Sequence, residues 1–291
     1  MCSEIHPLVS VIISSYNHTD YIEKSISSVF DQTYDNIELL VIDDGSTDNS
    51  VKKIQELQKK FLFDFQVQEN KGLTRTLNEA VKRTKGGFIL FLGSDDIMLP
   101  NRIALQVEYM EDKPELGICG GNMELIDAQG NLLPPEKQRY KNAPTGRFNF
   151  NDVFTQNKNV PSIPTQLFRK DVFEKVGGFN PEIRLDDIYI WLKITHAGYY
   201  IDRINALLSQ YRVHPTNTYK NIRFMSESLL KIYADYSDHP QYQYMRNRIL
   251  NSQFLKASSR DKKLARELLK QIPLPAWNGK TLRGAFRLLF S

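Results

Sequence analysis

Three short polar runs contain the side chains of this sequence that are best suited to chemistry. The runs are Ser14–Asn17, Asp43–Ser46 and Ser94–Asp96, and each follows a stretch of mainly apolar residues. Two runs carry adjacent aspartates, and neighbouring carboxylates at the end of a buried strand cost free energy unless another group offsets their charge. Mg²⁺ or Mn²⁺ does this well, because hard oxygen ligands suit both ions and leave positions for water and phosphate oxygens. The runs therefore predict a site where a divalent cation holds a phosphorylated ligand.

The apolar stretches before these runs predict strands that bring the runs together. Residues 8–14, 37–43 and 88–92 are apolar and rich in β-branched side chains, as strands buried on both faces are. The sequence between them predicts a short strand at 65–68 and three helices, at 20–31, after a capping Ser46, and at 74–83. This order implies a parallel sheet with right-handed crossovers. Because ligands bind beyond the carboxyl ends of parallel strands, the polar runs should converge.

Helix capping is the alternative function of the aspartates. Either pair could cap the helix that follows it, near Ser46 or near Pro100. Both pairs stand at matching strand ends, however, and Ser14 and Tyr16 stand beside them. This coincidence favours a ligand site over two separate caps.

The rest of the chain predicts a second half of the sheet and a helical extension. The expected elements are a helix at 100–111, a strand at 116–127, a polar loop or flap at 131–160, a strand from 162, and helices at 171–176 and 187–197. After Arg212 the sequence is polar and helical to its end. We therefore expect an α/β domain over 1–215, with halves of about 1–115 and 116–215, and a helical region over 216–291.

Composition limits the class of protein. With 41% hydrophobic and 25% charged residues the chain is typical of globular proteins, and its two cysteines form neither a disulfide framework nor a metal-knuckle pattern. The first residues lack the pattern of a signal peptide, and no run approaches the ~20 apolar residues of a membrane-spanning helix. We expect a cytoplasmic protein, soluble or peripheral on a membrane, with no nucleic-acid partner.

The ordered motifs resemble those of family 2 glycosyltransferases. The resemblance is carried by Val9–Asn17, by Ser28–Thr33 and Glu38–Asp48, and continues through Phe91–Asp96, Phe173–Phe179 and Tyr211–His214. It covers about residues 8–215. It implies the inverting GT-A fold, which is Rossmann-like with a mostly parallel central sheet flanked by helices. One departure concerns Gly93, where relatives often have an acidic residue.

The resemblance also assigns functional residues. It implies that Ser14, Tyr16 and Asp43 contact the nucleotide of a nucleotide sugar. The other expected nucleotide-binding residues are Asn17, Asp44, Arg75, Ser94 and Asp95, and Lys71 is a weaker candidate to steer the diphosphate. Asp96 is the expected principal ligand of Mn²⁺ or Mg²⁺, with Asp95 and His214 as further metal candidates.

Asp186 and Asp187 are the candidates for catalytic base. Inverting transfer needs a group that accepts the proton of the attacking hydroxyl. The segment 185–192 resembles the family's acidic motif before a Trp-containing helix, which favours Asp187 as the base and Asp186 as its partner, although the assignment could be reversed. Either aspartate could instead be the N-cap of that helix. Trp191 shares a helical face with apolar neighbours and is expected in the core rather than against a sugar.

The C-terminal region resembles a basic amphipathic membrane anchor. Residues 262–272 and 281–290 each combine an apolar face with cations, and Trp277 lies between them. Such helices bind anionic membrane surfaces in the plane of the interface. The alternative is that the apolar faces pack on the catalytic domain or in a homodimer.

These observations predict an inverting, metal-dependent hexosyltransferase. The expected donor is a UDP-linked sugar and the expected acceptor a glycan or lipid-linked saccharide, used at the inner face of the cytoplasmic membrane for a surface polysaccharide such as O-antigen or capsule. One alternative is a rhamnosyltransferase that uses a dTDP- or GDP-linked donor. Another is a catalytically silent GT-A module that binds glycan or serves in assembly. A nucleotidyltransferase is disfavoured, because no Gly-rich phosphate loop with an arginine follows the first strand.

Overall fold

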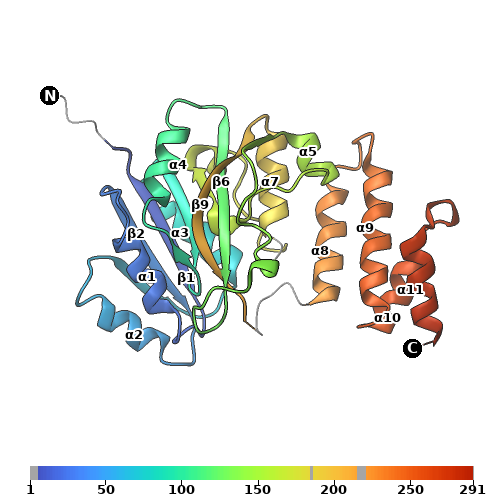
Figure 1. Ribbon diagram of the computed structural model, residues 1–291, viewed down its shortest axis with the longest axis horizontal. Coiled ribbons are helices and arrows are strands. Elements are labelled where there is room, and N and C mark those ends of the chain that lie inside the picture. The colour runs from blue at the N-terminus through green and yellow to red at the C-terminus, as the bar shows by residue number, and fades with distance from the viewer. Residues whose placement is uncertain (1–5, 184–185, 215–220, 291) are drawn as a thin grey trace. The chain divides into compact units, whose positions relative to one another are not determined.

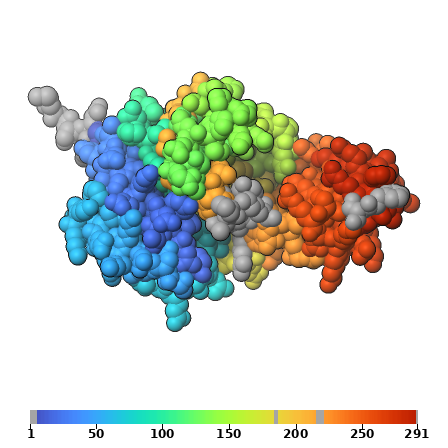
Figure 2. Space-filling view, turned by 60° about the horizontal axis from the view of Figure 1, so that its bottom comes forward, coloured from blue at the N-terminus to red at the C-terminus, as the bar shows by residue number. Residues whose placement is uncertain are grey.

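The computed structural model describes residues 6–183, 186–214 and 221–290, which are coloured in Figure 1 and Figure 2 and form two compact units. Unit 1 comprises Met1–Glu182 and Ile190–His214, and unit 2 comprises Ile183–Tyr189 and Pro215–Ser291. Unit 1 contains the sheet and unit 2 is helical. Among the described residues, no helix is both long and apolar enough to cross a bilayer.

Four parallel strands form the N-terminal half of the sheet in unit 1. These are β1 (Val9–Ser15), β2 (Ile37–Asp44), β3 (Asp64–Gln68) and β4 (Phe88–Gly93). They are joined by α1 (Ile22–Phe30), α2 (Ser50–Leu57) and α3 (Leu73–Arg83). The chain passes from β1 to β2 and β3 through α1 and α2, and then returns through α3 to β4 on the other side of β1. Because each crossover is right-handed, α1 and α2 cover one face of the sheet and α3 covers the other (Figure 1). Strand residues such as Val11, Ile13 and Leu90 are therefore wholly buried.

The second half of the sheet mixes strand directions. It contains β5 (Ile97–Met98), β6 (Leu116–Ile126), β7 (Gly146–Phe148), β8 (Leu167–Arg169) and β9 (Tyr200–Arg212). The strand order is β3-β2-β1-β4-β8-β6-β9-β5, with β7 paired to β9, and β8 runs antiparallel to both of its neighbours. The remaining helices of this region are α4 (Arg102–Met110), α5 (Phe150–Thr155), α6 (Lys170–Lys175) and α7 (Asp186–His196). The predicted fold class, an α/β sheet of the GT-A type flanked by helices, is confirmed.

Two local predictions differ from the structure. The expected loop at 131–160 contains a 3₁₀ turn at Pro135–Lys137 as well as β7 and α5. Helix α5 forms because the side chains of Asn149 and Asp152 each accept a backbone N–H of the other, which is a capping box. Ser46 does not cap α2, which begins four residues later at Ser50. The hydroxyl of Ser46 donates to Asp43 instead.

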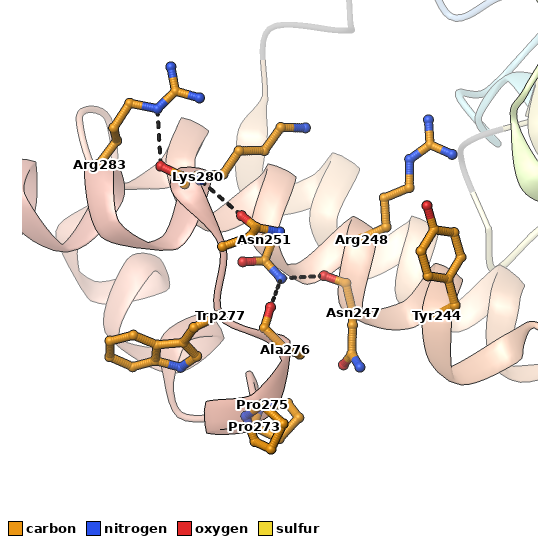
Figure 3. Close-up of a pocket in the computed structure, with 12 residues that line it drawn as sticks. Tyr244, Asn247, Arg248, Asn251, Pro273, Pro275, Ala276, Trp277, Lys280 and Arg283 are labelled. Carbon is orange, nitrogen blue, oxygen red and sulfur yellow. Dashed lines mark hydrogen bonds between the residues drawn. The ribbon is translucent and has the colours of Figure 1, made fainter.

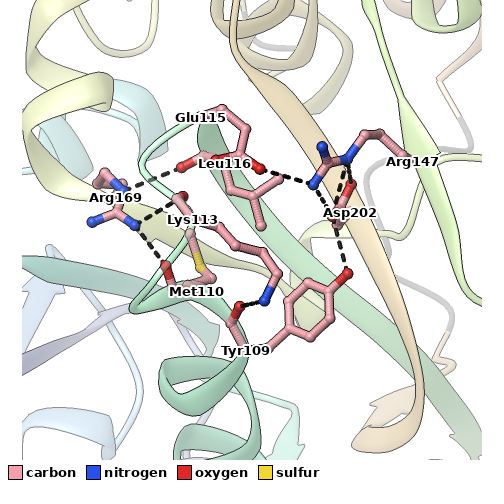
Figure 4. Close-up of polar contacts among 8 residues, drawn as sticks. All are labelled: Tyr109, Met110, Lys113, Glu115, Leu116, Arg147, Arg169 and Asp202. Atoms are coloured by element: carbon pink, nitrogen blue, oxygen red, sulfur yellow. Dashed lines mark hydrogen bonds and ion pairs between the residues drawn. The ribbon is translucent and has the colours of Figure 1, made fainter.

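A polar network joins the end of α4 to the four strands β6, β7, β8 and β9 (Figure 4). Buried Asp202 on β9 accepts two hydrogen bonds of 2.9 Å from Arg147 and one of 3.1 Å from the Tyr109 hydroxyl. Arg169 donates to the carbonyl oxygens of Met110, Lys113 and Leu116. Burial and the neighbouring Asp202 raise the pKa of Tyr109 to about 12, so the phenol stays a donor. These contacts hold the end of α4 against β6, β7, β8 and β9.

Unit 2 is built from four α-helices in its described C-terminal part, with a 3₁₀ turn between the last two. They are α8 (Ile222–Ala234), α9 (Tyr242–Ala257), α10 (Lys262–Leu269), η4 (Leu274–Ala276) and α11 (Gly279–Phe290). Gly284 lets α11 approach α9 closely, since a Cβ at that position would lie 2.6 Å from the Phe254 ring. Buried Thr281 donates to Asn251 across the same contact.

The apolar face of α10 is buried inside unit 2. Leu264, Leu268 and Ile272 are at most 5% exposed and pack with Leu250 and Phe254 of α9. The prediction that this helix presents its apolar face to a membrane is therefore wrong, and the face packs on α9 rather than on the catalytic domain or in a homodimer, which was the alternative. In α11 the outcome is mixed, because Ala285 and Leu288 pack inward while Leu282, Phe286 and Leu289 are 61%, 64% and 77% exposed.

Candidate active site

The three polar runs lie at one edge of the sheet, at the ends of β1, β2 and β4. In the strand register Ser15 is paired with Asp43 of β2, and Ser14 is paired with Gly93 of β4. Neighbouring strands in a sheet are ~4.8 Å apart. The ends of β2 and β4 therefore lie on either side of the end of β1, each one strand away. The backbone therefore brings the three polar runs together at one edge of the sheet, as predicted.

Asp43 and Asn17 organise the first side of this edge. Buried Asp43 accepts hydrogen bonds from the backbone N–H and the hydroxyl of Ser46, at 2.8 and 2.6 Å. Asn17, at a positive φ of 53°, donates its N–H to the Ser46 hydroxyl and accepts from the N–H of Thr47. These bonds tie the loop after β1 to the loop after β2. The Tyr16 ring is 48% exposed and remains available to stack on a ligand.

Asp44 and Arg75 lie on the α3 side of the edge. The Asp44 carboxylate accepts the backbone N–H groups of Lys71 and Gly72, both at 2.9 Å, and the Gln68 amide at 2.8 Å. It thereby holds the start of α3 against the end of β2, with Arg75 exposed in the first turn of that helix. Lys71 forms an ion pair with Glu79. The bonds of Asp44 are structural, and its predicted contact with the nucleotide stays a prediction, as does that of Arg75.

His18, Asp95 and His214 form a compact group of possible metal ligands. One ligand atom from each lies within 4.8 Å of those of the other two. His214 Nε2 is 2.8 Å from Asp95 Oδ2, and His18 Nδ1 is 2.7 Å from the hydroxyl of buried Ser94, which orients the ring. Burial lowers the pKa of His18 against the opposing charge of Asp95, which favours the neutral imidazole that binds metals.

Asp96 lies beside this group but is not part of it. The side chain is 3% exposed, and its Oδ1 accepts the backbone N–H of Arg212 at 2.9 Å. Burial, then the charge of Asp95, raises the pKa of Asp96 well above its usual range. A Cβ on Gly93 would lie 2.7 Å from an Asp95 oxygen and 2.9 Å from an Asp96 oxygen, so the glycine makes room for both carboxylates. The prediction that Asp96 is the principal metal ligand stays a prediction.

Arg212 holds the two aspartates and the turn after β6. The guanidinium is buried, donates to the carbonyl oxygens of Asp95, Asp127 and Ala128 at 2.8 to 3.2 Å, and lies 4.8 Å from the centre of the Tyr21 ring. Tyr21 in turn packs against the rings of His18 and His214, at 5.8 and 5.6 Å between centres. Arg212 and Tyr21 therefore set the positions of the possible metal ligands.

The sequence reasoning missed His18, Tyr21 and Arg212. A histidine directly after Asn17, at the carboxyl end of the first strand, was a signal for the first of them. Arg212 stood beside the predicted His214, but nothing in the sequence pairs it with the aspartates more than a hundred residues earlier.

The donor set fits a first-row divalent cation. Two imidazoles and one carboxylate suit Mn²⁺ better than Mg²⁺, since Mg²⁺ is bound mainly by oxygen. Three protein ligands would leave positions open for diphosphate oxygens and water. The edge can thus hold a cation and the phosphates of a nucleotide together.

The base candidates lie at the start of α7. Asp187 belongs to Ile183–Tyr189 of unit 2, and its Oδ1 accepts the N–H of Ile188 at 2.7 Å. Burial raises the pKa of Asp187. The Asp186 side chain lies outside the described residues. Trp191 is half-buried and donates its indole N–H to Gln166 at 3.1 Å, which is a structural contact.

Comparison with known proteins places this geometry in a family. The sequence pattern described as Glycosyl transferase family 2 matches residues 10–177. The Escherichia coli protein named UDP-Glc:alpha-D-GlcNAc-diphosphoundecaprenol beta-1,3-glucosyltransferase WfgD is 32% identical over 220 residues, which is 74% of this chain and 80% of that protein. Some relatives are longer, and the chain spans 38% of an uncharacterized glycosyltransferase of Rickettsia conorii.

Solved structures share the fold at low sequence identity. The S. aureus protein TarS, in a complex with UDP-GlcNAc, superposes with a TM-score of 0.67 at 17% identity, over 92% of this chain and 82% of that one. A mannosyltransferase of Pyrobaculum calidifontis, in a complex with GDP-Man and Mn²⁺, gives a TM-score of 0.62 at 16% identity, over 99% of this chain and 88% of that one.

Proposed function

The chain belongs to glycosyl transferase family 2, and from this premise we propose that it transfers a hexose, with inversion, from a UDP-linked sugar to a lipid-linked saccharide. The name of the Escherichia coli relative supports this choice, since that protein is described as a UDP-glucose-dependent transferase acting on a diphosphoundecaprenol-linked sugar. The observation that carries the proposal is the meeting of Asp43, Tyr16 and the His18–Asp95–His214 group at one sheet edge.

Each part of the edge has a role in this proposal. The Tyr16 ring stacks on the base, and Asp43 and Ser14 hold the nucleoside. His18, Asp95 and His214 would hold Mn²⁺, which when bound would offset the charge that grows on the departing diphosphate. Arg75 supplies a further positive charge at the start of α3. Placing Asp95 and His214 in fixed contact before the donor arrives spares the site a rearrangement during the reaction.

Asp187 completes the reaction as the base. The acceptor hydroxyl attacks the anomeric carbon, a new C–O bond forms as the bond to the diphosphate breaks, and the hydroxyl proton passes to the Asp187 carboxylate. A raised pKa favours this role, because the carboxylate then binds a proton more readily than an ordinary aspartate. Attack from the face opposite the leaving group converts an α-linked donor to a β-linked product.

A donor screen tests the proposal directly. UDP-, GDP- and dTDP-sugars are offered with Mn²⁺ and a diphosphate-lipid-linked saccharide, and the released nucleoside diphosphate and the anomeric configuration of the product are measured. We expect UDP release and a β-linkage. In Asp187→Asn we expect loss of turnover with donor binding retained, whereas the exposed Asp112→Asn should behave as the wild type. Near-normal turnover in Asp187→Asn refutes that choice of base, and use of GDP- or dTDP-sugars alone refutes the choice of donor.

We also propose that the protein works at the cytoplasmic face of a membrane, bound peripherally through α11. Leu282, Phe286 and Leu289 form an exposed stripe, and Arg283 and Arg287 lie next to it on the helix surface. Removing the chain after Ile272 would be a poor test, because it uncovers Phe254 and other core residues of unit 2. Leu282→Ser with Phe286→Ser leaves that core intact. This variant should lose binding to vesicles, while unchanged binding would contradict a peripheral anchor.

A further inference from the structure

Unit 2 has a groove of about 720 Å³ between α9 and the segment from Pro273 to the start of α11 (Figure 3). This volume is in the range of small-molecule sites, and all residues that line the groove belong to unit 2. The roles assigned above to the sheet edge make no use of it.

Three cations line the groove on one side. Arg248 projects from α9, and Lys280 and Arg283 project from the first turns of α11. In Figure 3 Arg283 and Arg248 lie toward opposite ends of the drawn residues, with Lys280 between them and the Tyr244 hydroxyl beside Arg248. Arg283 Nε donates to the Gly279 carbonyl at 3.1 Å, which fixes the base of the side chain and directs its terminal nitrogens outward. None of the described residues that line the groove is acidic. The groove is therefore lined by positive charge and suits an anionic ligand.

The opposite wall of the groove is apolar. Pro273, Pro275 and Ala276 form it, with Trp277 beside them (Figure 3). Leu282 and Phe286, which precede and follow Arg283 by one and three positions, carry the exposed apolar stripe of α11. Cations that line a groove beside exposed apolar side chains match a ligand that has a phosphate and an acyl chain joined together. A nucleic acid would leave the apolar stripe in water.

The charge of the surrounding region agrees with an anionic partner. Residues 221–290 contain thirteen Lys and Arg against five Asp and Glu, whereas the whole chain has a net charge of only +4. A membrane that contains anionic lipids attracts such a region before any specific contact forms.

From these observations we infer that the groove binds the phosphate of an anionic phospholipid headgroup, with the acyl chains of that lipid lying along the stripe of α11. This inference rests on the proposed membrane association of α11 and adds a specific site to it. In this inference the preference for anionic lipids comes from the groove and not from the overall positive charge of unit 2.

The test compares two triple variants that lose the same charge. The groove variant is Arg248→Gln, Lys280→Gln and Arg283→Gln. The control is Lys262→Gln, Lys263→Gln and Arg266→Gln, which are exposed cations on α10 outside the groove. The full chain is sedimented with vesicles of phosphatidylcholine alone or mixed equally with phosphatidylglycerol. We expect the groove variant to lose on the order of 100-fold in affinity for the mixed vesicles, corresponding to about 1 kcal/mol for each of three cations at the surface. The control should lose less than a tenth of that.

The outcomes separate the inference from the proposal beneath it. Equal losses in the two triple variants mean diffuse attraction and overturn the groove site, while membrane association stands. If the wild type binds neither kind of vesicle, the groove site and the proposed membrane association are both overturned. Soluble glycerol phosphate carries the same phosphate and should lower the vesicle binding of the wild type but not that of the groove variant; equal effects on both overturn the groove site. Binding of a DNA oligonucleotide that the groove variant loses, or a dimer that the groove variant dissociates, overturns the lipid as its ligand.

Discussion

Replacing Arg212 by lysine should weaken both the fold of unit 1 and its metal site. The arginine is 1% exposed and its guanidinium makes three hydrogen bonds to backbone carbonyl oxygens, from Asp95, Asp127 and Ala128. Lysine keeps the charge but has a single ammonium, which we expect to keep one of the three bonds, in the turn at Asp127 and Ala128, and to leave the Asp95 carbonyl without its donor. Two bonds to a charged donor are then lost, at about 1.5 kcal/mol each. The expected loss of stability is about 3 kcal/mol.

Thermal unfolding and metal binding measure the two consequences separately. For a unit of this size a loss of about 3 kcal/mol lowers Tm by roughly 6 to 12 °C. Because the Asp95 carbonyl loses its donor, the carboxylate beside His214 is no longer held in place. Mn²⁺ affinity, measured by calorimetry without any sugar donor, should fall about 10- to 100-fold, as when residues that orient metal ligands are replaced.

Arg169→Lys is the matched control for this substitution. Arg169 also donates to three backbone carbonyl oxygens and stacks on an aromatic ring, that of Phe88 at 5.1 Å, but it touches no possible metal ligand (Figure 4). It should lower Tm comparably and leave Mn²⁺ binding unchanged. If Arg212→Lys also binds Mn²⁺ normally while Tm falls, Arg212 is structural only. An unchanged Tm would show that the energy assigned to its hydrogen bonds is wrong.

Three further outcomes follow from individual side chains. Because burial raises the pKa of Asp187 and a base must be ionised, kcat/KM should fall as the pH decreases through a pKa above 3.8; a flat profile down to pH values near 3.8 would count against it. Burial raises the pKa of the Cys119 thiol to about 12, so in a Cys2→Ser background a thiol reagent should react only after denaturation, and rapid native labelling would contradict this burial. Asp202→Asn breaks the paired bonds to Arg147 and should lower stability by about 2 kcal/mol, read as a fall in Tm, with Mn²⁺ affinity unaffected.

The sheet edge was predictable because its strands are buried on both faces. Such strands appear in sequence as continuous apolar runs, and the structure moves the expected limits of the first by one residue, to Val9–Ser15. The rule that parallel strands present ligand groups at their carboxyl ends then brought Asp43 and Asp95 to one edge. The same rule could have found His18, which directly follows Asn17 at the end of the first strand, whereas His214 follows β9 and meets Asp95 only through the fold.

The helices of unit 2 show a limit of amphipathic patterns. A helix that lies on a membrane and a helix that packs on its neighbour have the same apolar stripe, so the sequence of α10 could not decide between them. Helix α10 packs within unit 2 because Leu250 and Phe254 of α9 contact its Leu264 and Leu268. In α11 the contact is made by small residues, with Gly284 and Ala285 facing inward, which leaves the larger Leu282 and Phe286 outside.

Charge is distributed unevenly between unit 2 and the part of the chain that contains the sheet. Outside residues 221–290 the chain has twenty-five Lys and Arg against twenty-nine Asp and Glu, so the part that contains the sheet is slightly acidic although the whole is basic. An acidic edge binds a nucleotide diphosphate only through a cation, since bare carboxylates repel phosphate. A basic surface binds phosphate directly and loses that binding as salt rises. Donor binding should therefore depend on Mn²⁺ and little on ionic strength, whereas vesicle binding should be lost with salt and be insensitive to chelators. If added salt or a chelator abolished donor binding and vesicle binding together, the sheet edge and unit 2 would bind phosphate in the same way, and this reasoning would be wrong.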